Sequence, residues 1–461
     1  MVEHLADGLI MFGITGDLAH KRLFPAIYHL AVDGELVDPV VGVGRTEGDD
    51  ADLRERAAAS LEDAGITIDR EVFGRLADAL CYVQGDYRDP ETYGMIAKRL
   101  GERHSTVAYL AVPPGLFEEV VEGMAGAGLH RHGRLVVEKP FGRDFKSARE
   151  LNGVIHRFYP EERVYRIDHF LGKEALQNLM VYRFSNTVLE PIWNRHYVRG
   201  VQVTLAEDFG VEGRGSFYDS VGALRDVVQN HMLELVALLA MEPPVSGKPR
   251  ALRDERVKVL SAAEPFEPGS VVRGQYSGYT AEPGVGPDSD TETYFAATTQ
   301  IDSWRWAGVP WIIRTGKGLA ETVTEAVVEF NRPPRMLFAG ADMAPGPNRL
   351  VFQSKPEDRI TLSMRAKQPG PDMVSRRVDL STLSSHPSGH GTDAYQRLLG
   401  DALRGDASLF AREDGVMESW RIVEPVLDDH PPVVGYEPGT WGPAEADSLL
   451  GADWKWLTPP D

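Results

Sequence analysis

Two short segments of the chain concentrate side chains that can bind anions and transfer protons. The first, RIDHFLGK at 166–173, places two cationic side chains, a carboxylate and an imidazole within eight residues. His169 and Lys173 are four residues apart, so they share one face if the segment is helical, and such a pair suits a phosphate. Asp168 can orient a catalytic base. On the residues alone, a local cluster of salt bridges explains the segment equally well.

The second segment, RDVVQNH at 225–231, lies in a helical pattern and ends in a histidine. Histidine is the usual general base near neutral pH. With about 100° of rotation per residue in an α-helix, Asp226 and His231 are separated by about 140° around the axis, which argues against direct pairing. A structural role is the more common one for an isolated helical histidine, and the residues alone leave this alternative open.

A glycine turn follows the first apolar run of the chain. Gly13 and Gly16 flank Thr15 in GITGDLA (13–19). Glycines at a strand-to-helix turn allow the backbone to approach a pyrophosphate, which then lies at the N-terminus of a helix. Thr15 replaces the middle glycine of the usual GxGxxG pattern, so a plain tight turn is the alternative. Pro25 is expected in the first turn of the helix that follows.

Two further basic residues follow predicted strands. Arg45 comes directly after VVGVG (40–44), where a fold selective for NAD usually carries an acidic residue. An arginine suits the 2′-phosphate of NADP instead. Lys139 precedes Pro140, which holds it extended at the carboxyl end of a strand, where open α/β sheets bind ligands. Either side chain can also be an ordinary solvated residue.

The elements that position these residues alternate over roughly the first third of the chain. Short β-rich runs are expected at 9–14, 40–44, 81–85, 107–112 and 134–139. Helical patterns follow at 115–129 and 147–158. Strands separated by helix-length crossovers indicate βαβ units. The pattern predicts an α/β Rossmann-type domain with a doubly wound parallel sheet.

From Val198 onward the pattern changes to longer alternating runs, which lie at 198–208, 324–333 and 359–366. Such alternation predicts antiparallel strands covered on one side. A single helical stretch is expected at 220–241. We therefore expect a Rossmann-like domain at 1–172 and, at 173–461, an α+β domain with a large, mainly antiparallel sheet.

The composition excludes several function classes. The chain has 461 residues, with 49 Lys and Arg against 69 Asp and Glu, so its formal net charge is −20. Such an acidic chain lacks the positive field that nucleic acids and anionic membranes need, so a local basic cluster must hold any anionic ligand. No run approaches the roughly 20 apolar residues of a membrane span. The single cysteine fits a reducing compartment, and we expect a cytoplasmic protein.

Other residues capable of chemistry have simpler explanations. Cys81 lies in an apolar run and is expected in the core rather than as a nucleophile. His386 and His390 are four residues apart, but they lie in a loop-like stretch without a third ligand, so no metal site is expected. The three tryptophans between 304 and 311 are expected in an aromatic core.

Taken together, these motifs resemble the glucose-6-phosphate 1-dehydrogenase family. The likeness runs in order along nearly the whole chain, and RIDHFLGKE (166–174) and RDVVQNH (225–231) are its most specific stretches. Further matching stretches are GITGDLAHKRLFPAIYHL, VVEKPFGRD and EDFGVEGRG. The resemblance implies NADP-dependent oxidation of D-glucose 6-phosphate at C1 to 6-phospho-D-glucono-1,5-lactone, in the oxidative pentose phosphate pathway. It also implies that 1–172 binds NADP and that 173–461 binds substrate and forms the oligomer.

The resemblance implies a role for each matching residue. His231 would be the base that removes the proton of the C1 hydroxyl, and Asp168 would orient it. The 6-phosphate would be bound by His169 and Lys173. The sugar hydroxyls would be contacted by Lys139, Glu207, Asp226 and Lys317. No metal is required for this chemistry.

For the cofactor, the resemblance implies an NADP-binding turn formed by Gly13, Thr15, Gly16, Asp17 and Leu18. Arg45 would contact the 2′-phosphate. Arg22 stands where the family often carries lysine, and it would keep positive charge near cofactor and substrate. Asp86 and Tyr87 would lie close to the adenosine. Lys139 would be near both cofactor and sugar, with Pro140 in the hinge between them.

One position departs from the family pattern. Five residues after Lys317, many relatives carry a basic residue that helps to hold the substrate, whereas this chain has Thr322. Val323 stands where some relatives add a basic residue for a second, structural NADP, so that second site loses support here. We expect a higher Michaelis constant for glucose 6-phosphate than in relatives with the basic residue. A Thr322→Lys variant with an unchanged constant would contradict this expectation.

Two alternatives remain at this point. One is a related sugar oxidoreductase of different specificity, which the phosphate-binding pair His169 and Lys173 disfavours. The other is a non-catalytic paralogue with a regulatory role, which the joint presence of Asp168, His231 and Lys139 disfavours. The resemblance further suggests a homodimer or homotetramer formed through the sheet of the second domain.

Overall fold

The computed structural model describes residues 5–335, 337–338, 346–383, 393–451 and 454–457. The chain divides into two compact units. Unit 1 comprises Met1–Lys173, Pro244–Asp254 and Thr392–Met417, and unit 2 comprises Glu174–Pro243, Glu255–Gly391 and Glu418–Asp461. Two later segments therefore return to unit 1, which a linear reading of the sequence does not foresee. The division of functions between 1–172 and 173–461 stays a prediction.

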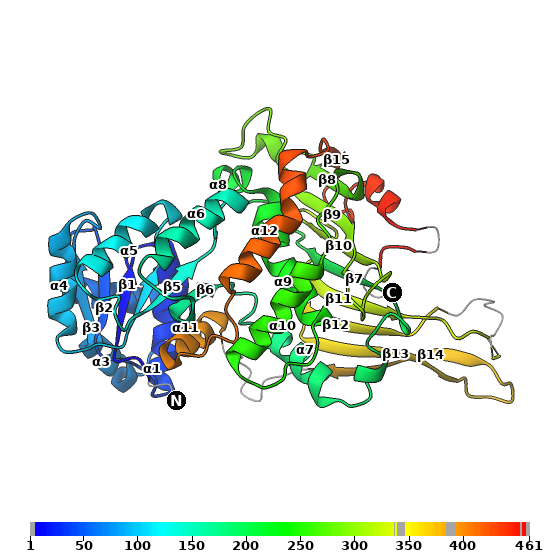
Figure 1. Cartoon of the computed structure of the whole chain (residues 1–461), viewed down its shortest axis with the longest axis horizontal. Coiled ribbons are helices and arrows are strands. Elements are labelled where there is room, and N and C mark those ends of the chain that lie inside the picture. The colour runs from blue at the N-terminus through cyan, green and yellow to red at the C-terminus, as the bar shows by residue number, and fades with distance from the viewer. Residues whose placement is uncertain (1–4, 336, 339–345, 384–392, 452–453, 458–461) are drawn as a thin grey trace. The chain divides into compact units, whose positions relative to one another are not determined.

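Unit 1 is built around a parallel sheet of six strands (Figure 1). The strands are β1 (Gly8–Phe12), β2 (Val40–Gly44), β3 (Leu80–Gln84), β4 (Thr106–Leu110), β5 (Arg134–Glu138) and β6 (Val164–Ile167). Their order is β3-β2-β1-β4-β5-β6, which confirms the doubly wound Rossmann-type prediction. The strand order reverses between β1 and β4. Ligands of such sheets bind outside the carboxyl ends of the strands at this point.

The helices of unit 1 occupy the crossovers between these strands. They are η1 (Ala19–Leu23), α1 (Phe24–Val32), α2 (Asp50–Asp63), α3 (Arg70–Ala79), α4 (Pro90–Leu100), η2 (Pro114–Leu116), α5 (Phe117–Gly126), α6 (Phe145–His156) and η3 (Glu161–Arg163). Aspartates cap α2, α3, α4 and α6 by accepting backbone N–H groups of the first turn. Pro25 lies in the first turn of α1, as predicted. Far along the chain, α11 (Ala394–Arg404) packs against α1.

Five of the six strands of unit 1 match the runs predicted from the sequence to within one or two residues. The missed strand is β6, which has only four residues and includes a buried tyrosine and a buried arginine. So short and polar a run lacks the continuous apolar signal of a parallel strand. The predicted helical patterns at 115–129 and 147–158 correspond to α5 and α6.

Unit 2 contains a mixed sheet of nine strands, most of whose pairs are antiparallel (Figure 1). The strands are β7 (Val198–Ala206), β8 (Val271–Tyr276), β9 (Tyr294–Thr299), β10 (Trp311–Gly316), β11 (Val323–Phe330), β12 (Arg349–Lys355), β13 (Arg359–Lys367), β14 (Ser375–Leu383) and β15 (Val434–Tyr436). Their order is β14-β13-β12-β11-β7-β10-β9-β8-β15. Only the β7–β10 and β8–β15 pairs of these nine strands are parallel. The predicted large antiparallel sheet is confirmed.

Helices pack on this sheet and position its functional residues. They include α7 (Glu174–Ser185), α8 (Gly215–Asp219), η5 (Leu224–Met232) and α9 (Leu233–Ala240), while η4 (Glu190–Ile192), η6 (Pro268–Ser270), η7 (Tyr279–Ala281) and η8 (Ala444–Leu449) are short. In unit 2, α7 contacts β12 and α9, and η5 contacts β10. The remaining helices are α10 (Pro249–Ala262) and α12 (Glu413–Asp428). Among the described residues, no helix combines the length and apolarity needed to cross a membrane.

The single α-helix predicted over 220–241 is wrong in part. Its middle part is the π-helix η5, and a longer α-helical stretch follows only in α9. A π-helix bonds residue i to residue i+5, and an apolar pattern at this length does not distinguish it from an α-helix. Such segments occur often at functional sites.

Candidate active site

The turn between β1 and η1 requires glycine at its first position. Gly13 has φ +79°, and a Cβ placed there would lie 2.2 Å from the carbonyl oxygen of Ala111, which directly follows the neighbouring strand β4. The Gly13 N–H donates to the carbonyl of Val43 and to the hydroxyl of Tyr87, each at 3.0 Å. The Gly16 N–H donates back to the Gly13 carbonyl at 2.9 Å. The predicted Thr15 lies in the same turn, whereas the predicted Asp17 and Leu18 begin the helical segment that follows it.

Tyr87 supports this turn from within unit 1. Its side chain is buried, its hydroxyl bonds to Gly13, and burial raises the pKa of Tyr87 above its usual value. Above it, the exposed Arg45 guanidinium lies 5.5 Å from the centre of the Tyr87 ring. Asp86 accepts the backbone N–H of Arg88 at 3.0 Å. Tyr87 therefore holds the turn, a contribution that the sequence did not indicate.

Arg56 is a supporting residue that sequence reasoning missed. It lies in α2, and its Nη2 donates to the Thr15 carbonyl at 2.7 Å. Thr46, which follows β2, donates its hydroxyl to that of Thr15 at 3.3 Å. Arg56 belongs to a charged helix whose sequence gives no sign of a contact with residue 15. The glycine turn, its bracing and the arginines around it fit a dinucleotide, whose phosphates need close backbone approach and positive charge.

The segment after β6 forms consecutive tight turns rather than the α-helix in which His169 and Lys173 share a face. The N–H groups of residues 171, 172 and 173 each donate to the carbonyl three residues earlier, and α7 begins only at Glu174. Asp168 is buried, and its Oδ1 accepts the Phe170 N–H at 2.9 Å. The carboxylate thereby closes the first turn of this segment.

Aromatic rings hold the two predicted phosphate ligands. The His169 imidazole stacks on Tyr395 of α11, with ring centres 6.1 Å apart and planes 6° apart. The Lys173 ammonium lies 4.7 Å from the centre of the Phe170 ring. The later segment that returns to unit 1 thus contributes Tyr395 to this cluster, a contact that no local motif announces.

Glu138 is a partly buried acid at the end of β5 that sequence reasoning also missed. Its Oε1 accepts a hydrogen bond from the Tyr109 hydroxyl on the neighbouring β4. Burial raises the pKa of Glu138 to about 7, although the Tyr109 hydrogen bond and Lys139 act in the opposite direction; Asp168 raises it further. The acid directly precedes the predicted ligand Lys139. The peptide between Lys139 and Pro140 is cis.

In unit 2, two predicted sugar ligands form an ion pair. Glu207 and Lys317 directly follow β7 and β10, which are parallel neighbours, so both lie at the same edge of the sheet. The Lys317 Nζ is 2.5 Å from Glu207 Oε2. It also lies 5.2 Å from the ring centres of both Phe209 and Tyr218. Burial, with Asp226 among the nearby acids, raises the pKa of the Tyr218 hydroxyl.

His231 is a buried residue of η5, with 7% of its surface exposed. The expected separation of about 140° between Asp226 and His231 assumed α-helical rotation and is wrong. In a π-helix the hydrogen bonds join residues five apart, so residues 226 and 231 lie closer to one face than in an α-helix. Asn230 fixes the end of the segment, because its Oδ1 accepts the His231 N–H at 2.7 Å and its Nδ2 donates to the Arg225 carbonyl at 3.0 Å.

Glu292 fixes the start of η5 and was not predicted. Its Oε1 accepts the Leu224 N–H at 2.9 Å, and its backbone carbonyl accepts the Ala223 N–H at 3.0 Å. Its other oxygen is 2.8 Å from the buried Arg273 guanidinium. Gly222, with φ +66°, has no side chain, and a Cβ there would lie 2.4 Å from Glu292 Oε1. The carboxylate that positions η5 thus lies some seventy residues away in sequence.

Thr322, the departure from the family pattern, closes the turn after β7. Its hydroxyl accepts the Asp208 N–H at 3.1 Å and donates to the Asp208 carboxylate. The residue beside Glu207 is therefore held by a neutral hydroxyl. The expected effect on the Michaelis constant stays a prediction.

The remaining expectations are confirmed for some residues and wrong for others. Cys81 lies in β3, and burial raises the pKa of its thiol to about 11, which suits a core residue and not a nucleophile. Trp306 and Trp311 are buried as expected, but Trp304 is 91% exposed, so its placement in the core is wrong. It lies in a turn between β9 and β10, where its side chain faces solvent. His386 and His390 fall outside the described residues.

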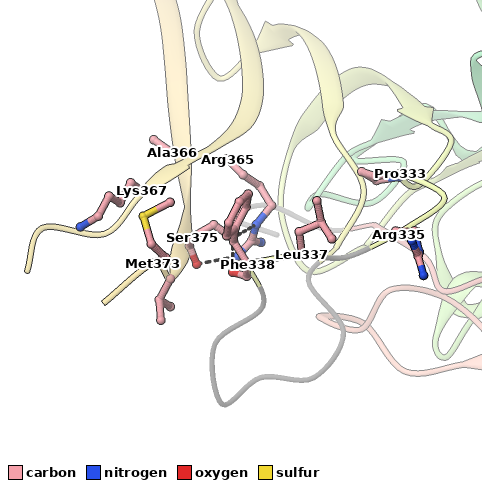
Figure 2. A pocket seen from close by; sticks show the side chains of 10 residues that line it. Pro333, Arg335, Leu337, Phe338, Arg365, Ala366, Lys367, Met373 and Ser375 are labelled. Carbon is pink, nitrogen blue, oxygen red and sulfur yellow. Dashed lines mark hydrogen bonds between the residues drawn. The ribbon is translucent and has the colours of Figure 1, made fainter. Parts of the chain in front are cut away.

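Unit 2 has a cavity of about 450 Å³ between the β13–β14 hairpin and the chain that follows β11. Figure 2 shows the side chains that line it. Arg365 crosses from β13 to bond Ser375 of β14, and Ser375 bonds the Phe338 carbonyl. Leu337, Phe338 and Met373 give it an exposed apolar wall. None of the predicted catalytic, sugar-binding or cofactor-binding residues lines it.

The sheet order of unit 1, with a glycine turn at its switch point, defines a Rossmann-type dinucleotide-binding protein. Comparison with known families agrees. Residues 10–178 match the model of the glucose-6-phosphate dehydrogenase NAD binding domain, and residues 180–457 match that of the glucose-6-phosphate dehydrogenase C-terminal domain. Together the two matches span nearly the whole chain.

Individual relatives extend this result. The chain is 42% identical to glucose-6-phosphate 1-dehydrogenase 1 of Mycobacterium tuberculosis, over 98% of this chain and 97% of the relative. It is 39% identical to glucose-6-phosphate 1-dehydrogenase of Aggregatibacter actinomycetemcomitans, over 97% of each. The crystal structure of glucose-6-phosphate 1-dehydrogenase from Mycobacterium avium superposes with a TM-score of 0.92 at 42% identity, over 99% of each chain.

The chain belongs to the glucose-6-phosphate dehydrogenase family. Family membership confirms the predicted fold class, the oxidoreductase class and NADP as the cofactor. It does not favour the alternatives of a different sugar specificity or a non-catalytic paralogue.

Proposed function

We propose that the protein oxidises D-glucose 6-phosphate at C1 to 6-phospho-D-glucono-1,5-lactone and reduces NADP. The observation that carries the proposal is a match over the full length to a glucose-6-phosphate dehydrogenase in complex with its substrate glucose-6-phosphate. That structure is 33% identical, with a TM-score of 0.91, over 99% of this chain and 100% of the other. Each unit contributes some of the residues that the sequence assigned to this chemistry.

We assign the proton transfer to His231. The imidazole takes the proton of the C1 hydroxyl as the C1–H bond breaks, and Asp168 stabilises the imidazolium that forms. Bound NADP supplies the nicotinamide that accepts the hydride. A general base of this kind typically contributes a rate factor of about 10²–10⁴.

Substrate binding rests on charge placed at two positions of the fold. His169 and Lys173 bind the 6-phosphate dianion, because two cationic or donor groups within one turn region suit its oxygens. Lys139 and the Lys317–Glu207 pair supply donors and an acceptor for sugar hydroxyls. The protein has a net charge of −20, so these local cations must outweigh the overall repulsion of an anionic substrate.

Cofactor selectivity rests on Arg45 in this proposal. An arginine after the second strand favours the 2′-phosphate of NADP through charge-assisted hydrogen bonds. Gly13 and Gly16 allow close approach of the pyrophosphate. The cytoplasmic location stays a prediction from the sequence.

We also propose a homo-oligomer formed through the sheet of unit 2. In the β13–β14 register, Leu362 pairs with Leu380 and Met364 with Val378, so these four apolar side chains share one face of the hairpin. Leu380 and Met364 are 53% and 43% exposed. An apolar face beside an edge strand favours association with another copy.

The first experiment follows NADPH absorbance with purified protein, glucose 6-phosphate and NADP⁺, with a parallel NAD⁺ reaction. We expect turnover with NADP⁺, a loss of about 10²–10⁴-fold in kcat for His231→Asn, and little change for His196→Asn, which alters an exposed histidine of the same unit. Unchanged kcat in His231→Asn would remove the assigned base. Absence of turnover in a folded, NADP-binding wild type would overturn the proposed substrate.

A further inference from the structure

A histidine and two glutamates of unit 1, none of which is assigned to the reaction, lie close together. His156 ends α6, Glu161 begins η3, and Glu413 begins α12. The His156 Nε2 lies 2.8 Å from Glu413 Oε2 and 3.4 Å from Glu161 Oε2. The three candidate ligand atoms all lie within 4.8 Å of one another.

The tautomer of His156 directs its free nitrogen toward the carboxylates. Its Nδ1 lies 2.9 Å from the Tyr159 carbonyl oxygen, which can only accept a hydrogen bond. Nδ1 must therefore carry a proton, and the lone pair of a neutral imidazole lies on Nε2. A carbonyl that fixes the ring in this way is the usual outer partner of a metal-binding histidine.

Hydrogen bonds hold the Glu161 carboxylate in one orientation. The Arg166 guanidinium, which is 1% exposed, donates to both of its oxygens at 2.8 and 2.9 Å. The Glu413 N–H donates to Oε1 at 2.9 Å. Arg166 is itself fixed by Asn152 Oδ1 at 2.9 Å. Glu161 Oε2 thus stays directed at the imidazole, while the partly exposed Glu413 side chain can adjust.

The electrostatics of this arrangement call for a cation. A lone pair and two carboxylate oxygens lie together, and only one of the carboxylates has an arginine partner among the contacts described above. We propose that His156, Glu161 and Glu413 bind a divalent transition-metal ion, for which Zn²⁺ is the best match. Zn²⁺ takes imidazole nitrogen and carboxylate oxygen at about 2.0–2.2 Å, often with water as a fourth ligand. An imidazole ligand disfavours Mg²⁺ and Ca²⁺, which prefer oxygen alone.

Solvent can reach the three side chains, and an ion bound to them would connect three elements of the fold. The side chains of His156, Glu161 and Glu413 are 25%, 22% and 39% exposed, so an ion can enter from solvent. The ion would join the end of α6, the start of η3 and the start of α12 within unit 1. Because it binds the folded form only, it would raise the stability of that form.

The test is Zn²⁺ titration of the untagged, full-length protein by calorimetry after chelator treatment and dialysis. We compare the wild type with His156→Asn, with the near-isosteric Glu413→Gln and with His132→Asn, which alters an exposed histidine of the same unit. We expect the wild type and His132→Asn to bind one more Zn²⁺ per chain than the other two, or to bind it at least tenfold more tightly. Zn²⁺ should raise the melting temperature of the first pair more than that of the second.

Binding to adventitious sites is common to all four proteins and cancels in the comparison. Equal stoichiometry and affinity in all four would overturn the proposal and leave His156 as a neighbour of the two glutamates without a bound ion. Loss of binding in Glu413→Gln alone would also overturn it, because the imidazole would then not be a ligand. Circular dichroism checks that each variant is folded. If His156→Asn does not fold, Glu413→Gln still tests the site.

Discussion

The hydroxyl of Tyr87 is a single group on which the cofactor turn depends. It accepts a hydrogen bond from the Gly13 N–H, which also donates to the Val43 carbonyl. The Arg45 guanidinium lies over the ring of the same tyrosine. We expect Tyr87→Phe to cost about 0.5–1.5 kcal/mol in the free energy of unfolding, because the Gly13 N–H keeps its second acceptor. NADP binding should weaken several-fold as the turn loosens. Urea unfolding and NADP titration by fluorescence measure the two effects.

Tyr197→Phe is a suitable control, because it removes the hydroxyl of a half-exposed tyrosine in unit 2. Unchanged stability together with equal NADP affinity in Tyr87→Phe would mean that the hydroxyl does not brace the turn. A stability loss with unchanged affinity would mean that the hydroxyl serves folding and not cofactor binding.

The carboxyl of Glu138 makes stability depend on pH. Burial raises its pKa from the usual glutamate value of 4.5 to about 7. Between these values the folded protein binds more protons than the unfolded chain, so the free energy of unfolding falls as pH rises through the window. Above pH 7 the penalty is constant, at up to about 3 kcal/mol. Glu138→Gln, which can still accept from Tyr109, should therefore lose less stability than the wild type between pH 5 and 8.

Urea unfolding at several pH values measures this difference. Glu55→Gln, which alters an exposed glutamate of α2, should keep the pH dependence of the wild type. Parallel stability curves for wild type and Glu138→Gln would show that Glu138 titrates normally in the folded protein.

At the scale of elements, η5 depends on one buried carboxylate at its start. Glu292 accepts the Leu224 N–H and pairs with Arg273, and their side chains are 7% and 6% exposed. Glu292→Gln leaves a buried guanidinium without its counter-charge, which typically costs about 3–5 kcal/mol. Because His231 lies in the same element, kcat should fall as well. Thermal unfolding and steady-state kinetics measure both.

Glu267→Gln is the matched change at an exposed glutamate of unit 2 and should alter neither quantity. A stable Glu292→Gln variant with reduced kcat would still support the positioning of η5. A destabilised variant with full kcat at low temperature would show that the cap serves folding alone.

The same element shows why sequence reasoning reached part of the site and missed the rest. The spacing of RDVVQNH marked Asp226 and His231, but hydrophobic periodicity cannot distinguish a π-helix from an α-helix over so few residues. The expected angle between the two side chains was wrong because it assumed an α-helix. Their support comes from Glu292, whose distance along the chain hides the contact.

For the whole molecule, local patterns predicted both sheets, since strand order in an α/β unit follows from short crossovers and right-handed connections. They did not predict that Thr392–Met417 returns to unit 1, where Tyr395 stacks on His169. Contacts between segments more than two hundred residues apart depend on tertiary packing. No periodicity within either segment encodes them.

The apolar face of the β13–β14 hairpin allows the proposed homo-oligomer to be tested through the assembly state of the whole molecule. Light scattering coupled to size exclusion should show a dimer or larger assembly for the wild type. Leu380→Asp places a charge on this face, and burying it in an interface costs enough to weaken association at least tenfold. Val188→Asp, at an exposed apolar residue outside the sheet, should keep the assembly of the wild type. A monomeric wild type would contradict the homo-oligomer, and an unchanged assembly in Leu380→Asp would place the interface elsewhere.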